Sequence, residues 1–276
     1  MALKSVLLAL GVLLLGGCVD VDTLIQVRTD GSGTVTQKVM VSERLVAPLR
    51  ALTEGLGGDG KRRSLVMPDE EDMAARAEAM GPGVRLVDMQ ERRRDDAEGY
   101  VARYAFDDVR ALRINQNPGN LAPGAGAGTR RLSGAEHITF DFSPGPPAEL
   151  TVMFPDRGGR EVEPRPPEDR PGGPGPEALR AELGELFKGL RVAMAVQVEG
   201  TVLETDATHR DGPRITLMAI DFEELLAAPE YLDELAERRP RSLEEAKELL
   251  RDFPGIKLEL APAIHIRFVD YGLRAI

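Results

Sequence analysis

The sequence predicts an α+β fold: an antiparallel sheet built from successive hairpins, with helices packed on one face. Three observations predict it. Segments with alternating apolar residues recur along the chain, turn-forming Gly, Asp and Pro residues join them in pairs, and segments with helix-start signals lie between the pairs. With 276 residues, 42% of them hydrophobic, the chain is long enough to bury a core.

The first hairpin follows directly after the only cysteine. Apolar and polar residues alternate over 19–27, with Leu24 as the exception, and Val35, Val39 and Val41 mark a second strand. The turn Asp30-Gly31-Ser32-Gly33 lies between them and supplies the backbone freedom that a tight reversal needs. We therefore expect a β-hairpin at the start of the folded chain.

Helix signals and two further hairpins come next. Ser42 can cap a short helix carrying Leu45, Leu49 and Leu52, and Pro68 with the acidic residues 69–72 begins another helix, which Gly81 ends. Alternation predicts two strand pairs: 84–89 with 100–106 around the polar turn 92–96, and 138–142 with 150–154 around the turn 143–147.

The C-terminal part repeats this arrangement. A helix begins at Pro176, and the strand 192–198 is followed by 215–219 across a loop that contains Asp211-Gly212. Asp221 with Glu224, and Ser242 with Glu245, predict two helix starts. The apolar residues of 256–268 fall on even positions; because Pro262 lacks a backbone donor, we expect this strand at a sheet edge or bulged there.

Two segments lack any such pattern. Residues 117–131 predict a flexible Gly/Ala loop, and 155–176, with seven prolines and five glycines, predicts an exposed connector. We expect one ectodomain over 18–276; the alternative is two lobes, 19–154 and 177–276, on either side of the connector.

The N-terminus predicts export. Lys4 precedes the apolar run Val6–Leu15, which is too short to span ~30 Å of hydrocarbon but fits the core of a signal peptide. Leu15, Gly16, Gly17 and Cys18 then resemble the lipobox of bacterial lipoproteins: an aliphatic residue three before the cysteine, with small residues beside it. A thiolate is a suitable nucleophile for taking up a diacylglyceryl group. The alternative is an ordinary secretory signal with a cysteine near the cut by chance.

The lipobox resemblance implies how the chain is processed and where in the cell it is located. It implies cleavage of residues 1–17, a thioether-linked lipid on Cys18 and an acylated amine, for which palmitate is the usual label. Two or three acyl chains hold a protein on a membrane for practical purposes permanently. The chain would be an extracytoplasmic protein of the cell envelope or periplasm; Val19 stands where an aspartate favours inner-membrane retention, so the outer membrane is favoured in a diderm cell.

A second resemblance extends further along the chain. The order Asp30-Gly31-Ser32-Gly33-Thr34, Gly99-Tyr100 leading to Phe106-Asp107-Asp108, and the strand through Val198 to Thr205 is similar to LppM-type bacterial lipoproteins over residues 18–222. The resemblance implies a compact ectodomain with a lipid-binding tendency and no catalytic residues to carry over. Many members have a C-terminal transmembrane helix; we expect Cys18 to be the only anchor here.

Composition and motifs favour no enzyme. The formal charge of −11 disfavours nucleic-acid binding, and we expect no catalytic residues, no metal site and no cofactor, because nucleophile and phosphate-loop motifs are absent. His137 and His265 fall on the polar positions of strands, where a solvent-facing role is the usual explanation. The loop 204–209, which ends at His209, gathers three possible metal ligands, and a divalent ion there would need a fourth donor from elsewhere. For Asp69–Asp72 and Asp107-Asp108, solvated surface is the simpler interpretation. The basic runs 61–63 and 92–94 could contact lipid headgroups, or neighbouring acids could neutralise their charge. Neutralisation is the favoured interpretation.

We therefore expect a non-enzymatic lipoprotein, anchored to a bacterial membrane through Cys18, that binds a lipid or other apolar ligand. The alternative is an envelope protein-interaction or assembly module that uses the edge strand 256–268 to bind a protein partner. A cell-wall hydrolase is a third class, for which the sequence offers no residue set.

Overall fold

The computed structural model describes residues 19–43, 67–94, 97–115, 137–155, 189–228, 231, 245, 250–251 and 253–270. The signal peptide and lipobox lie outside these residues, as do the predicted loop 117–131 and the connector from residue 156 onward. The helices predicted after Ser42, Pro176 and Ser242 also fall on residues that are mostly outside the described ranges.

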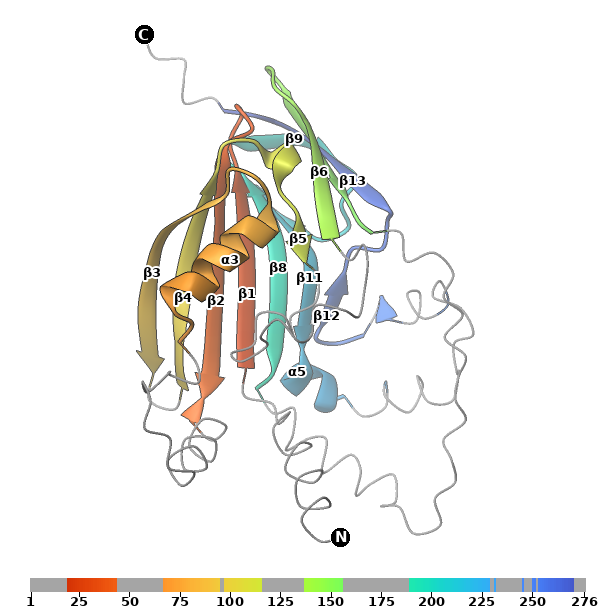
Figure 1. Ribbon diagram of the computed structural model, residues 1–276. Coiled ribbons are helices and arrows are strands. Elements are labelled where there is room, and N and C mark those ends of the chain that lie inside the picture. The colour runs from red at the N-terminus through yellow and green to blue at the C-terminus, as the bar shows by residue number, and fades with distance from the viewer. Residues whose placement is uncertain are drawn as a thin grey trace, which may run out of the picture.

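Two β-sheets form the described part of the protein (Figure 1). The large sheet has eight strands in the order β10-β11-β8-β1-β2-β4-β3, with β12 also paired to β11, and the small sheet has five in the order β5-β6-β7-β13-β9. Strand accounts for 57% of the described residues and helix for 14%. The predicted α+β fold with helices packed on one face is therefore wrong: much of the layer assigned to helices is a second sheet.

The bounds of the elements follow the alternating segments closely. The strands of the large sheet are β1 (Val19–Val27), β2 (Gly33–Ser42), β3 (Arg85–Arg94), β4 (Ala97–Phe106), β8 (Arg191–Val198), β10 (Arg210–Asp211), β11 (Arg214–Asp221) and β12 (Ile256–Leu258). Those of the small sheet are β5 (Ile114–Asn115), β6 (His137–Ser143), β7 (Ala148–Met153), β9 (Thr201–Thr205) and β13 (Ala263–Val269). The helices are α3 (Glu70–Met80), α5 (Phe222–Leu226) and the 3-10 turn η1 (Val109–Ala111).

The predicted hairpins are confirmed as antiparallel pairs. β1 pairs with β2, β3 with β4, β6 with β7, and β8 with β11. One turn differs, because β3 runs on through Arg94 and the basic run 92–94 is part of a strand instead of a turn. The prediction also missed a parallel pair: β8 lies beside β1 in the centre of the large sheet, with Thr23 aligned to Met194.

The core lies between the inner faces of the two sheets. One cluster of buried side chains takes residues from both, including Ile25, Val35 and Tyr104 of the large sheet and Phe140 and Ile266 of the small sheet. These residues occupy alternate strand positions, which is the pattern of a strand with one buried face. The apolar side chains of the alternating segments thus pack one sheet against the other.

Helix α3 covers part of the same inner face and matches its prediction. Asp69 is the N-cap and forms a capping box with Asp72, and Gly81 ends the helix. Met73, Ala77 and Met80 are buried in the core cluster, and in Figure 1 the helix crosses in front of β1, β2 and β4.

The last predicted strand is divided between the sheets. Residues 256–258 form β12 beside β11, and 263–269 form β13, which pairs with β7 on one side and β9 on the other. The break includes Pro262, where the chain leaves one sheet for the other. β13 is therefore an interior strand, and the exposed edge strand 256–268 proposed for a protein partner is not present as one element.

Strand 198–205 is corrected in the same way. β8 ends at Val198, Gly200 has a φ of +139°, and β9 continues in the small sheet. A left-handed φ of this kind favours glycine, and a Cβ at Gly200 would lie 2.3 Å from the carbonyl oxygen of Val269.

Candidate functional site

The predicted lipid-attachment residue precedes the described fold by one position. Cys18 and the lipobox residues Leu15, Gly16 and Gly17 lie outside the described residues, whereas Val19 is the first residue of β1. The sheet therefore begins immediately after the cysteine, so at most one peptide unit separates the predicted lipid from the large sheet.

The strand register identifies what surrounds Val19. Val19 is aligned with Val41 of β2, Val41 with Glu98 of β4, and Glu98 with Arg93 of β3. We call this end of the large sheet the Val19 end; it is the lower end in Figure 1. The basic run 92–94 lies at this end, three strands from β1.

Only one arginine of this run is paired with an acid. Arg93 Nη2 lies 2.8 Å from Glu91 Oε1, and Arg92 Nη2 donates to the neutral amide oxygen of Gln90 at 2.7 Å. Arg93 thus has an acidic neighbour, as the favoured prediction of neutralisation expects, whereas the acids that directly follow the run, at 95 and 96, lie outside the described residues. The other basic run, 61–63, lies outside these ranges.

A lysine–aspartate pair crosses the same end. Lys38 Nζ lies 2.6 Å from Asp20 Oδ2, and both side chains are about two-thirds to three-quarters buried, with exposed fractions of 30% and 26%. This pair links β1 to β2 two residues after Cys18. Asp20 is the described acidic residue that lies closest in sequence to Cys18.

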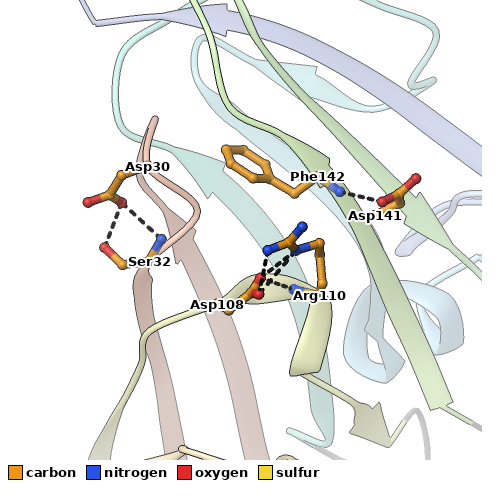
Figure 2. Close-up of polar contacts among 6 residues, drawn as sticks. All are labelled: Asp30, Ser32, Asp108, Arg110, Asp141 and Phe142. Carbon is orange, nitrogen blue, oxygen red and sulfur yellow. Dashed lines mark hydrogen bonds and ion pairs between the residues drawn. The ribbon is translucent and has the colours of Figure 1, made fainter.

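The opposite end of the large sheet carries a polar corner (Figure 2). In the β1–β2 turn, Asp30 Oδ1 accepts hydrogen bonds from the backbone N–H and the hydroxyl of Ser32, at 2.9 and 2.7 Å. These bonds, with the side-chain one the stronger, hold the pKa of Asp30 below its usual value. The prediction that Asp30-Gly31-Ser32-Gly33 forms a turn between two strands is confirmed.

Two other carboxylates of Figure 2 are also used locally. Asp108 Oδ2 accepts from Arg110 Nη2 at 2.8 Å, and this bond lowers the pKa of Asp108. Asp141 Oδ1 accepts from the backbone N–H of Phe142 at 2.8 Å. Each acid bonds within its own turn or strand, and it is the backbone N–H of Val109, donating to the carbonyl oxygen of Gly31 at 2.9 Å, that holds η1 against the hairpin.

The candidate catalytic and metal residues are dispersed in the same manner. Asp107 pairs with Arg85 at 3.1 Å, and Asp69 and Asp72 cap α3. In the segment 204–209, Glu204 accepts from Arg267 and Asp206 from His265, each at 2.8 Å. No group of three His, Cys, Asp or Glu side chains suited to a metal is found among the described residues.

Histidines 137, 209 and 265 lie on separate elements of the small sheet and its loops. His265 Nδ1 lies 2.8 Å from Asp206 Oδ2, with side-chain exposures of 66% and 53%. Asp206 also accepts from the backbone N–H of His265 at 2.6 Å, and its pKa is lowered by the hydrogen bonds from His265, against the opposing effect of burial. The pair fastens β13 beside the end of β9.

The sequence analysis missed one residue at the Val19 end. Arg191 begins β8 and is aligned with Asp20 of β1. It has no motif signal, because its position depends on the parallel pairing of strands that are distant in sequence. Only the β8 alternation, which places Arg191 on the polar phase, could have indicated that it faces solvent.

Comparison with known proteins gives one weak structural match. No protein-family model matches the chain, and no curated protein does. The NMR structure of the folded domain of the Mycobacterium tuberculosis LppM protein matches with a TM-score of 0.33 and 9% identity, covering 94% of this chain and 95% of that chain. This similarity is too low to establish a shared fold. Among the described residues, no helix is long and apolar enough to cross a membrane.

Proposed function

We propose that the protein is a non-enzymatic lipoprotein of the bacterial cell envelope, held on a membrane by lipid attached to Cys18. The observation that carries the proposal is the order of the N-terminal residues: Lys4, the apolar run 6–15, and then Leu15-Gly16-Gly17-Cys18. The position of β1 is consistent with this proposal, because its first residue, Val19, directly follows Cys18 in the sequence and a lipid on Cys18 would lie beside the large sheet.

The negative charge of the chain means that membrane attachment depends on the lipid. A formal charge of −11 repels an anionic bilayer as a whole, so the folded domain has no general attraction to the membrane. Acyl chains contribute ~0.8 kcal/mol per buried methylene, which outweighs that repulsion when two or three chains are present.

The described structure does not favour an apolar ligand in the space between the sheets. The inner faces are filled by the protein's own side chains: Tyr100, Tyr104 and Phe268 are fully buried there, with exposures of 0%. The proposed function therefore includes no ligand bound between the sheets. The protein-partner alternative also loses its support, since β13 is paired on both sides.

The test is metabolic labelling. Cells that express the full chain are grown with an alkyne-tagged palmitate, and the protein is isolated from membranes. We expect label in the wild-type chain and none in Cys18→Ser, while Ser42→Ala, which changes another small polar residue, keeps the label. Equal labelling of the wild type and Cys18→Ser, or no label in either, would overturn the proposal.

A further inference from the structure

Gln37 of β2 is buried in the core without a hydrogen-bond partner. It lies on the inner face of the large sheet, in the same alternation as Val35 and Val39, and only 4% of the residue is exposed. Its amide oxygen Oε1 is buried and accepts no hydrogen bond from any described residue. Because folding removes this oxygen from water, the amide destabilises the fold unless another donor is supplied.

One other buried oxygen of the described chain, Asp22 Oδ1, also lacks a hydrogen bond, but its surroundings differ. Asp22 lies on the outward face of β1, its side chain is 36% exposed, and Arg214 Nη2 is 3.8 Å from Oδ1. Solvent and a cation therefore reach this carboxylate. Gln37 has neither, so its amide is the polar group of the core that requires an explanation.

The strand register shows which side chains surround this amide. Gln37 is aligned with Thr23 of β1 on one side and with Ala102 of β4 on the other. Aligned residues project to the same face of a sheet, so the diagonal neighbours of Gln37 on β4 are Tyr100 and Tyr104. All four neighbours are fully buried. Ala102 carries only a methyl group, and it lies between these longer side chains.

Tyr100 has the proton that Gln37 lacks. Its hydroxyl oxygen accepts a hydrogen bond from Arg76 Nη1 of α3 at 2.8 Å. Burial raises the pKa of Tyr100 against the opposing effect of Arg76, so the phenol keeps its proton at physiological pH. A guanidinium only donates, so this contact leaves the proton of Tyr100 without an acceptor. The Tyr104 hydroxyl differs, because it donates to Met73 Sδ at 3.0 Å.

We propose that one water molecule is bound in the core beside Ala102, where it accepts a hydrogen bond from the Tyr100 hydroxyl and donates one to Gln37 Oε1. A water suits this position because it both accepts and donates, and because a spare donor and a spare acceptor lie on neighbouring strands. Thr23 brings a hydroxyl next to the same amide, which suits the about three bonds that a buried water makes. The methyl group of Ala102 leaves the room that a larger side chain would take.

This water connects helix α3 to the centre of the large sheet. Arg76 of α3 donates to Tyr100 of β4, Tyr100 donates to the water, and the water donates to Gln37 of β2. The helix crosses in front of both strands in Figure 1. Its attachment thus combines the burial of Met73 with a chain of hydrogen bonds that ends on β2, and this inference does not depend on the lipid anchor.

The test is oxygen-17 magnetic relaxation dispersion on the full chain in detergent. The method counts water molecules that stay inside a protein for longer than the protein takes to rotate, and hydroxyl protons do not contribute to it. Gln37→Leu replaces the amide by an apolar group, and Tyr100→Phe removes only the donor hydroxyl. Tyr104→Phe is the matched control, since it makes the same change in the same strand. Cooperative unfolding by circular dichroism verifies that each variant is folded.

We expect the wild type to hold one long-lived water more than Gln37→Leu and one more than Tyr100→Phe, while Tyr104→Phe keeps the wild-type number. An unchanged number in Gln37→Leu or Tyr100→Phe, or an equal loss in Tyr104→Phe, would overturn the proposal. A crystal structure of the wild type tests it without any substitution. A water within hydrogen-bond distance of both Tyr100 and Gln37 would support it, and a direct bond between the two side chains would overturn it.

Discussion

Asp30 and Ser32 close the β1–β2 turn with two hydrogen bonds to a single oxygen, from the backbone N–H of Ser32 at 2.9 Å and its hydroxyl at 2.7 Å. Asp30→Ala removes both, and we expect the free energy of unfolding to fall by about 1 kcal/mol at neutral pH, since the site is largely solvent-exposed. Urea unfolding followed by circular dichroism, on the purified chain in detergent, measures the loss. Asp211→Ala, an exposed residue of β10 with no side-chain bond of this kind, is the control.

The same turn gives a pH dependence with a defined sign. Because hydrogen bonds from Ser32 lower the pKa of Asp30 in the folded state from 3.8, the ionised carboxylate stabilises the fold above pH 3.8, and this contribution is lost as the pH falls through the lowered pKa. The stability difference between the wild type and Asp30→Ala should thus shrink on acidification below pH 3.8. A difference that grows on acidification would contradict the assignment.

Gly99 lies in β4 where the neighbouring strand comes unusually close. A Cβ at this position would stand 1.9 Å from the carbonyl oxygen of Val39 and 2.8 Å from Met40 Cα, both backbone atoms of β2. Gly99→Ala should cost about 3 kcal/mol, because the two strands must separate. Gly212→Ala, with a φ of +56° and no atom within 4 Å of the added Cβ, should cost only about 1 kcal/mol. Thermal unfolding of both variants compares the two; equal losses would refute the steric explanation.

Met73 connects α3 to the large sheet. Its side chain is 0% exposed, and its sulfur accepts a hydrogen bond from the Tyr104 hydroxyl at 3.0 Å. Met73→Ala should lower the free energy of unfolding by about 3 kcal/mol, through lost burial and the cavity left behind. Glu78→Ala, an exposed change on the same helix, should stay within about 0.5 kcal/mol. Denaturant titrations test this; a small effect of Met73→Ala would mean that α3 does not pack as described.

Hydrogen exchange distinguishes the interior strand from the edge strand. β13 pairs with β7 and β9, whereas β3 pairs only with β4 among the described strands. Amides of β13 should exchange at least about a hundredfold more slowly than the outward amides of β3, since central strands open only with most of the global unfolding free energy. Mass spectrometry of peptic fragments measures both. Fast exchange across 263–269 would restore that segment as a docking edge.

The local pairings could be predicted from the sequence, because alternation and turn chemistry act over a few residues. The Asp30–Gly33 turn, the strands on either side of it and the Asp69 cap are of this kind. Residues 256–268 show the limit. Their even-numbered apolar positions form one continuous pattern, yet the chain turns at 259–262 and gives each half to a different sheet.

The alternation of apolar residues could not predict which strands pair when they are distant in sequence. β1 is aligned in parallel with β8, more than 160 residues later, and no local signal distinguishes this partner from another apolar strand.

The helices were overcounted for a related reason. The inner face of the large sheet had to be covered, and amphipathic helices were the visible candidates, but the short strands β6, β7, β9 and β13 pack there as well.

The central claim, a lipid on Cys18, is tested most directly by mass spectrometry of the N-terminal peptide of the protein extracted from membranes. We predict a peptide that begins at Cys18, with a diacylglyceryl group in thioether linkage to its sulfur. A peptide that begins at another residue, or one that begins at Cys18 with an unmodified thiol, would contradict the account.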